Sequence, residues 1–157
     1  MLCLVPTPIG NLEDISQRSL RILVEAELIF CEDTRVTKKL LNLLGERNNL
    51  DFSNKEYKSF HSHNEDKILK SLDKETFTKN VVYVSDAGMP CVSDPGATLV
   101  DYCIKNEIPY DVLPGANAIL TAYAMSGFST TTFSFYGFLD HKGVSRASQL
   151  NDALNDD

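Results

Sequence analysis

The sequence predicts an α/β domain in which a mostly parallel sheet is flanked by helices. Short apolar runs, such as Leu28–Cys31 and Val81–Val84, alternate along the chain with longer segments whose apolar residues recur at helical spacing. The runs lack the polar–apolar alternation of a half-exposed strand, which is typical of parallel strands covered on both faces. Pro- and Gly-rich segments follow several of these runs.

The first strand is expected over Leu2–Val5, and the prolines of the following PTPIGN segment end it. Asp14 and Gln17 form a capping-box pattern, which predicts a helix that begins at Asp14 and continues to about Ala26. The run Leu28–Cys31 is then the second expected strand.

The next helix follows EDTR, with apolar residues at positions 36, 40, 43 and 44, and Gly45 is expected just after its last turn. A polar, turn-like stretch covers residues 46–54. Tyr57–His61 is a candidate strand, and a short helix is expected to start near Asn64.

The fourth expected strand, Val81–Val84, has the clearest pattern because all four residues are apolar. Asp94 followed by Pro95 is typical of the start of a helix, which we expect to continue to about Lys105. Tyr110–Leu113 is the next expected strand.

After PGAN, the small residues of AILTAYAM predict another helix, and a last strand is expected over Phe133–Tyr136. The remaining segment, from residue 141 to residue 157, is polar and has no apolar core of its own. We therefore interpret this end as the opening of a further domain.

Composition favours a soluble globular chain. A chain of 157 residues is long enough for one ordinary domain that buries roughly 68–70% of its unfolded surface. No apolar run reaches the length of a membrane span and no basic leader precedes Leu2, so a cytoplasmic location is expected. The net charge of −7 argues against a nucleic-acid partner, which usually requires a basic surface.

The four cysteines, Cys3, Cys31, Cys91 and Cys103, have no Cys-x-x-Cys spacing. Cys3 and Cys31 lie in apolar runs, where cysteine packs as a small hydrophobic residue. We expect four reduced thiols and no metal site.

Three loops are candidates for ligand binding: PTPIGN, SDAGMPCVSDPG and PGAN each follow an expected strand. In parallel sheets, ligands bind outside the carboxyl ends of the strands. Each loop alone is typical of a simple connection, but three loops with Pro and Gly favour a common site. Neither a Walker loop nor a Gly-x-Gly-x-x-Gly loop is present, and Asp86 and Asp94 would favour a cation or a hydrogen-bond donor over a phosphate.

Six motifs occur in one order: VPTPIGNLEDIS, CEDTR, HSHNE, VSDAGMPCVSDPG, LPGANA and FSFYGFL. From residue 2 to about residue 142 the chain resembles the N-terminal part of the RNA-directed branch of the tetrapyrrole methylase family. The resemblance implies two α/β domains with S-adenosyl-L-methionine bound in the cleft between them, and a homodimer. It implies an N-terminal cofactor-binding domain over residues 1–136, with a linker and the truncated start of a second, largely missing α/β domain over 137–157.

The resemblance implies S-adenosylmethionine-dependent 2′-O-methylation of a cytidine in the ribosomal RNA of the small subunit. Two alternatives stay open. A tetrapyrrole substrate is less favoured because that branch usually opens with a Gly-x-Gly-x-Gly-Asp loop, which is absent here. The chain could also be a cofactor-binding fragment that is inactive without its second domain.

By resemblance, the cofactor contacts fall on residues of the three loops. Gly88 would let the backbone approach the methionine part, Val92 would form an apolar wall, and Asn117 would bond the adenosine. Asp86 would either face the positive charge of the cofactor or hold its own loop by bonding backbone N–H groups. The full set is Pro8, Asp86, Ala87, Gly88, Met89, Val92, Ser93, Asn117 and Ala118. Met89, Ala116 and Asn117 differ from the residues that are usual at these positions in the family.

Methyl transfer is an in-line displacement at carbon, to which positioning contributes roughly 7–11 kcal/mol, and a general base roughly 3–5 kcal/mol. In the matching motifs, Glu32, Asp33 and His63 are the candidate proton acceptors. Arg35 and His61 are candidate substrate contacts. Arg35 lies in the one local cluster of positive charge, which could equally be a solvated helix face, and either histidine could simply cap a turn.

Overall fold

The computed structural model describes residues 1–93 and 95–155, and it divides into two compact units, Met1–Ala118 and Ile119–Asp157. Asp94, the expected helix cap, lies outside the described residues. The division falls earlier than the domain boundary expected between residues 136 and 137, and that domain assignment stays a prediction.

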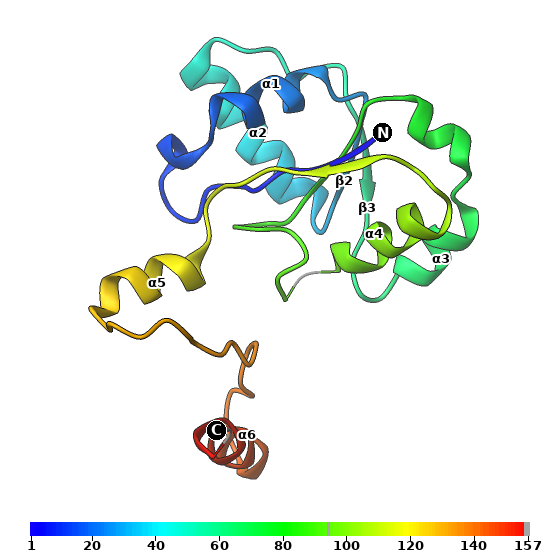
Figure 1. Cartoon of the computed structure of the whole chain (residues 1–157). Coiled ribbons are helices and arrows are strands. Elements are labelled where there is room, and N and C mark those ends of the chain that lie inside the picture. The colour runs from blue at the N-terminus through cyan, green and yellow to red at the C-terminus, as the bar shows by residue number, and fades with distance from the viewer. Residues whose placement is uncertain (94, 156–157) are drawn as a thin grey trace. The chain divides into compact units, whose positions relative to one another are not determined.

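A five-stranded sheet forms the centre of the first unit, in the order β3-β2-β4-β1-β5, and every pair of neighbouring strands is parallel. The predicted α/β class is confirmed (Figure 1). All five strands fall within or next to the expected segments. Their bounds are β1 Leu2–Leu4, β2 Leu28–Cys31, β3 Glu56–Ser59, β4 Val81–Val84 and β5 Tyr110–Val112.

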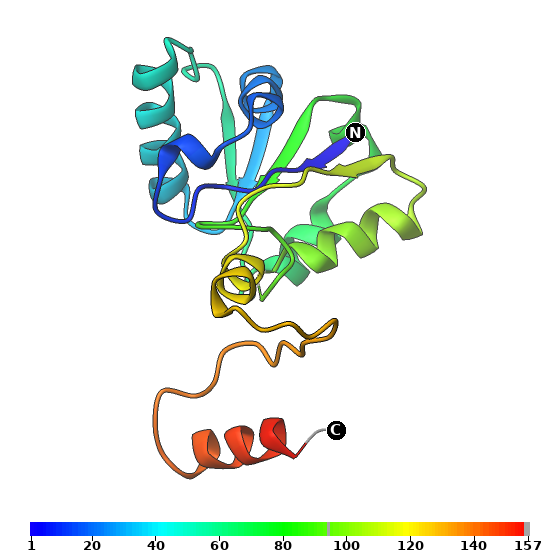
Figure 2. The same cartoon turned by 60° about the vertical axis from the view of Figure 1, so that its left-hand side comes forward.

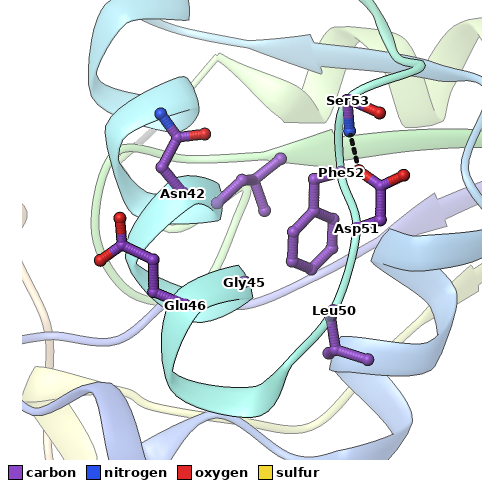
Figure 3. Close-up of a pocket in the computed structure, with 8 residues that line it drawn as sticks. Asn42, Gly45, Glu46, Leu50, Asp51, Phe52 and Ser53 are labelled. Atoms are coloured by element: carbon purple, nitrogen blue, oxygen red, sulfur yellow. Dashed lines mark hydrogen bonds between the residues drawn. The ribbon is translucent and has the colours of Figure 1, made fainter.

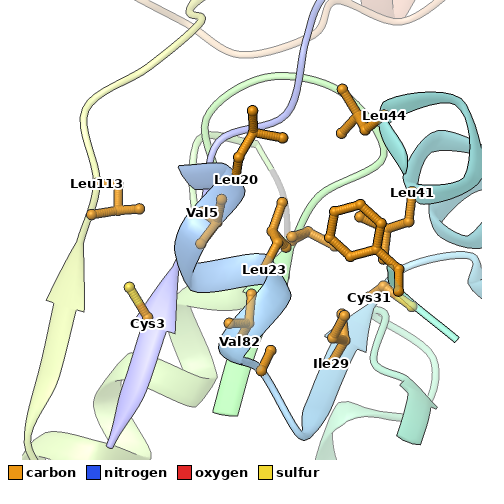
Figure 4. Packing of buried hydrophobic residues seen from close by; sticks show 13 residues of the cluster. Cys3, Val5, Leu20, Leu23, Ile29, Cys31, Leu41, Leu44, Val82 and Leu113 are labelled. Atoms are coloured by element: carbon orange, nitrogen blue, oxygen red, sulfur yellow. The ribbon is translucent and has the colours of Figure 1, made fainter. Parts of the chain in front are cut away.

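Helices cover both faces of this sheet, which explains why β1, β2 and β4 are apolar throughout (Figures 1 and 2). On one face, α1 (Gln17–Glu25) and α2 (Thr34–Asn48) bury leucines against Cys3, Ile29 and Val82, among others (Figure 4). On the other face lie α3 (Glu65–Ser71) and α4 (Gly96–Lys105), whose Leu99 and Cys103 pack in the cluster with Leu2, Phe30 and Tyr83.

The cysteines behave as hydrophobic core residues. Cys3, Cys31 and Cys103 are buried, and Cys91 is partly buried. Burial raises the pKa of Cys103 to about 11 and also raises the pKa values of Cys3 and Cys31. These thiols are protonated near neutral pH, as packing in an apolar core requires.

The predicted start of the first helix at Asp14 is wrong. Leu12–Asp14 forms a short 3₁₀ turn that is capped by Asn11, and α1 begins only at Gln17. Its cap is Ser16, whose hydroxyl oxygen accepts the Ser19 N–H at 3.0 Å. Asn11 therefore caps the 3₁₀ turn, and Ser16 caps the helix that follows it.

The predicted end of the second helix at Gly45 is also wrong. The helix continues to Asn48, and Asn49 provides the left-handed residue, with φ of 53°. Gly45 has a different role inside the helix, because a β-carbon there would lie 2.8 Å from the Leu50 carbonyl oxygen. The glycine is needed for close approach of the returning chain.

The second unit contains most of α5 (Ala118–Ser126) and all of α6 (Val144–Leu154). The expected strand over Phe133–Tyr136 is wrong, since the described residues of this unit include no strand. A strand requires a partner for its backbone N–H and C=O groups, and the ring of Phe133 instead stacks on Tyr123, with 4.9 Å between centroids. In the described part of the chain, no helix has both the length and the apolar character needed to span a membrane.

Candidate functional site

The loops that follow β1 and β4 are joined directly by their backbones. Thr7 N–H donates to the Gly88 carbonyl and Gly88 N–H donates to the Thr7 carbonyl, each at 3.0 Å. This pair is an isolated antiparallel bridge beyond the end of the parallel ladder. Two loops more than eighty residues apart in the chain are thereby fixed against each other.

Two buried hydroxyl groups reinforce this junction. Thr7 Oγ1 donates to the Ser85 carbonyl and Ser85 Oγ donates to the Gly88 carbonyl, both at 3.2 Å. Both side chains are only 1% exposed, so loss of either hydroxyl would leave a buried polar group without its bond. Sequence reasoning missed both residues, although each is a polar residue next to an apolar run.

The loop after β5 packs against the same junction. A β-carbon on Gly115 would lie 2.7 Å from Cβ of Pro6, so the backbone at Gly115 packs against the Pro6 ring more closely than a side chain would allow. A β-carbon on Gly88 would contact Ile9 at 3.3 Å and the Ala116 carbonyl oxygen at 3.8 Å. The three Pro- and Gly-rich loops therefore meet at the carboxyl edge of β4, β1 and β5.

Eight of the nine predicted cofactor contacts lie on these three loops, as their positions in the chain require: Pro8, Asp86, Ala87, Gly88, Met89, Val92, Ser93 and Asn117. The ninth, Ala118, is the first residue of α5. The loop after β4 has an unusual backbone. Gly88, Cys91 and Ser93 all have positive φ, at 89°, 69° and 64°, and such residues concentrate where a loop must take a fixed path.

Asp86 and Glu32 link the loops after β4 and β2. Asp33 N–H donates to Asp86 Oδ1 at 3.2 Å, and Asp86 N–H donates to Glu32 Oε1 at 3.1 Å. Of the two roles foreseen for Asp86, these bonds support the one in which its carboxylate holds loop backbone, although the loop it holds is the neighbouring one.

Asp33 caps the start of α2. Its carboxylate accepts the Arg35 N–H at 2.8 Å and pairs with the Arg35 guanidinium, Nη2 to Oδ2, at 2.6 Å. These hydrogen bonds from Arg35 lower the pKa of Asp33 to about 2. The same pairing raises the pKa of Arg35. Arg35 itself is 88% exposed, so its side chain can reach an external ligand.

His61 and His63 lie in the turn that follows β3. Asn64 holds this turn, since its Oδ1 accepts the His61 N–H at 2.9 Å and its Nδ2 donates to the Ser59 carbonyl at 3.0 Å. The two imidazole rings meet edge to face, with 5.9 Å between centroids. Over residues 1–93 and 95–155, no group of three His, Cys, Asp or Glu side chains could hold a metal ion.

Surface cavities of the first unit include one beside α2 and one beside the loop after β4. One, of about 250 Å³, lies beside the last turns of α2 and contains Gly45 opposite Phe52 (Figure 3). No predicted site residue lines it. The other, of about 360 Å³, is apolar and adjoins the loop after β4, from which Pro90 and Cys91 contribute. Leu4, Ala97, Val100, Tyr110 and Val112 complete its lining.

Comparison with known proteins places these features in a family. The family model described as Tetrapyrrole (Corrin/Porphyrin) Methylases matches residues 1–157. A crystal structure of uroporphyrin-III C-methyltransferase from Thermus thermophilus, complexed with S-adenosylhomocysteine, superimposes with a TM-score of 0.54 at 20% identity, over 78% of this chain and 51% of that one. At this level of identity, the comparison shows that the two chains share a fold.

Curated relatives named Ribosomal RNA small subunit methyltransferase I are more similar to this chain in sequence than that structure is. The protein from Campylobacter fetus is 51% identical over 99% of this chain and 58% of its own length. The protein from Helicobacter pylori strain J99 is 45% identical over 99% of this chain and 56% of its own length. The protein from Thermotoga maritima is 46% identical over 88% of this chain and 60% of its own length. The chain thus spans a little over half the length of these relatives.

Proposed function

The chain belongs to the family of tetrapyrrole (corrin/porphyrin) methylases, and we propose that its first unit binds S-adenosyl-L-methionine in an enzyme that methylates small-subunit ribosomal RNA. The observation that carries the proposal is the junction of the three loops through Thr7, Gly88 and Gly115. The names of the relatives at 45–51% identity support the RNA substrate.

The residues at the junction fit this cofactor. Gly88 leaves out a side chain that would meet Ile9, and we assign cofactor contacts to Gly88 and also to Pro8, Ala87, Met89, Val92, Ser93, Asn117 and Ala118. Asp86 places negative charge beside a ligand whose amino and sulfonium groups are cationic. The cofactor supplies an electrophilic methyl group, and the chain's own residues must hold the acceptor oxygen in line with it.

RNA would approach the edge formed by the loops after β2 and β3. Arg35 is our candidate phosphate contact because it is exposed at the start of α2, and His61 is a candidate nucleotide contact. Glu32, Asp33 and His63 are the candidates to accept the proton of the attacking 2′-hydroxyl. The low pKa of Asp33 makes its carboxylate a poor proton acceptor near neutral pH.

We further propose that the complete protein has a second α/β domain after residue 136, forms a homodimer and works in the cytoplasm. The length of the relatives supports the additional domain, since this chain covers 56–60% of them. Catalysis would then require the complete protein, while this chain alone would be a cofactor-binding part.

A tetrapyrrole substrate is the second candidate function, because the uroporphyrin-III C-methyltransferase shares the fold. Only 20% of residues are identical in that comparison, and the glycine-rich first loop typical of that branch is replaced by PTPIGN. Both observations favour RNA.

One experiment separates the two candidates. The full-length protein is incubated with S-adenosylmethionine and either small ribosomal subunits or a uroporphyrinogen, and the products are identified by mass spectrometry. We expect 2′-O-methylcytidine in the ribosomal RNA and an unmodified tetrapyrrole. Methylation of the tetrapyrrole alone would overturn the proposal.

A further inference from the structure

The loops after β2 and β4 are held together by a reciprocal pair of hydrogen bonds that no backbone ladder provides. The parallel ladder between these strands ends at Cys31 and Val84. Immediately beyond it, Glu32 accepts the Asp86 N–H, and Asp86 accepts the Asp33 N–H. Each loop therefore gives one backbone donor to a carboxylate of the other loop.

This pair, which we call the carboxylate interlock, connects two parts of the candidate site. On one side is the loop after β4, which carries Gly88. On the other is the start of α2, where Asp33 holds Arg35. The end of β3 joins as well, because Ser59 Oγ donates to the Glu32 carbonyl at 3.0 Å.

We propose that Glu32 and Asp86 are positioning residues, and that the interlock fixes the cofactor loop relative to the start of α2. The inference rests on the proposed function and refines it, since Glu32 then acts through the loop and does not accept the substrate proton. Burial and bonding support this role: Glu32 and Asp86 are both partly buried, and one oxygen of each carboxylate accepts a backbone N–H of the other loop.

The proposal depends on an accepting oxygen and not on a negative charge. Glutamine at position 32 keeps an oxygen that can accept the Asp86 N–H, whereas alanine removes it. A proton acceptor behaves in the opposite way, because glutamine cannot take up a proton from a hydroxyl. The two roles therefore predict different results for one conservative substitution.

The test compares Glu32→Gln and Glu32→Ala in the full-length protein, with Glu46→Ala as the control on an exposed glutamate of α2. We expect Glu32→Ala to weaken S-adenosylhomocysteine binding about tenfold by calorimetry, as removal of one charged hydrogen-bond partner would. Glu32→Gln should stay within about threefold of wild type in both affinity and kcat. Hydrogen exchange at the Asp86 amide should accelerate in Glu32→Ala only.

Two results would overturn the inference while leaving the proposed function intact. One is a Glu32→Gln protein that binds S-adenosylhomocysteine normally but has lost methyl transfer, which would identify Glu32 as the proton acceptor. The other is a Glu32→Ala protein with normal affinity and unchanged exchange at Asp86. The proposed function fails separately, if wild-type protein forms no 2′-O-methylcytidine; wild-type protein that binds no S-adenosylhomocysteine overturns both.

Discussion

Replacement of Gly115 by alanine tests whether the loops after β1 and β5 must touch. The new β-carbon would lie 2.7 Å from Cβ and 2.9 Å from Cγ of Pro6. Pro6 is buried and its ring has little freedom to move aside, so the loop after β5 has to shift away. Forcing extra atoms into such a contact costs about 1–3 kcal/mol.

The shift should be visible in both stability and ligand binding. In the full-length protein, urea unfolding should report a free energy lower by about 1–3 kcal/mol. Calorimetry should show a lower affinity for S-adenosylhomocysteine, because the shifted loop also forms part of the cofactor site. Each 1.4 kcal/mol lost from the binding free energy lowers the affinity about tenfold.

Gly127→Ala is the matched control for this experiment. Gly127 has φ of +69°, and a β-carbon there would meet nothing within 4 Å. Alanine at this position introduces backbone strain of roughly 1–2 kcal/mol without a clash, and it lies outside the three loops. A Gly115→Ala protein with wild-type affinity and stability would refute the view that close contact of the two loops builds the site.

Three further predictions concern single contacts. Thr7→Val removes the hydroxyl that donates to Ser85, and urea unfolding should show a loss of about 1–3 kcal/mol that Thr7→Ser avoids; equal stability of both variants would contradict this. Ser16→Ala should lower the unfolding free energy by about 1 kcal/mol, and Asp14→Ala by less than about 0.5 kcal/mol; the reverse order in urea titrations would restore Asp14 as the cap. The lowered pKa of Asp33, about 2, means that its contribution to stability is present above about pH 4 and is lost as pH falls through 2, so the urea midpoints of Asp33→Asn and wild type should differ at pH 7 and converge at pH 2. A difference that persists at pH 2 would contradict the assignment.

Local sequence predicted the sheet well for a physical reason. Strands covered on both faces must be apolar at every position, and Leu28–Cys31 and Val81–Val84 satisfy this without reference to the rest of the chain. Helix ends were less predictable, since Asp14 and Ser16 are both residue types that cap helices, and here Asp14 is the last residue of a 3₁₀ turn while Ser16 caps the helix. Phe133–Tyr136 has strand composition, but composition does not supply a pairing partner.

The candidate site could be predicted as a set of loops but not as a set of contacts. Pro and Gly mark where the chain bends, and the parallel topology puts those bends at one edge. Which residues join the bends depends on pairs far apart in sequence, such as Thr7 with Ser85, 78 positions apart, and Asp33 with Asp86, 53 positions apart. No periodicity or spacing within one segment carries that information.

The net charge of −7 does not conflict with an RNA substrate once the charges are located. Part of the acidic surplus is used inside the fold, because Glu32, Asp33 and Asp86 accept backbone N–H groups at the junction of the loops. Positive charge is instead presented at the start of α2, where Arg35 is exposed and Lys38 Nζ lies 5.0 Å from the ring centroid of Tyr57. Phosphate contacts depend on such local groups, whereas the total charge governs solubility and long-range attraction. The acidic total is therefore compatible with the proposed contact between Arg35 and the RNA backbone.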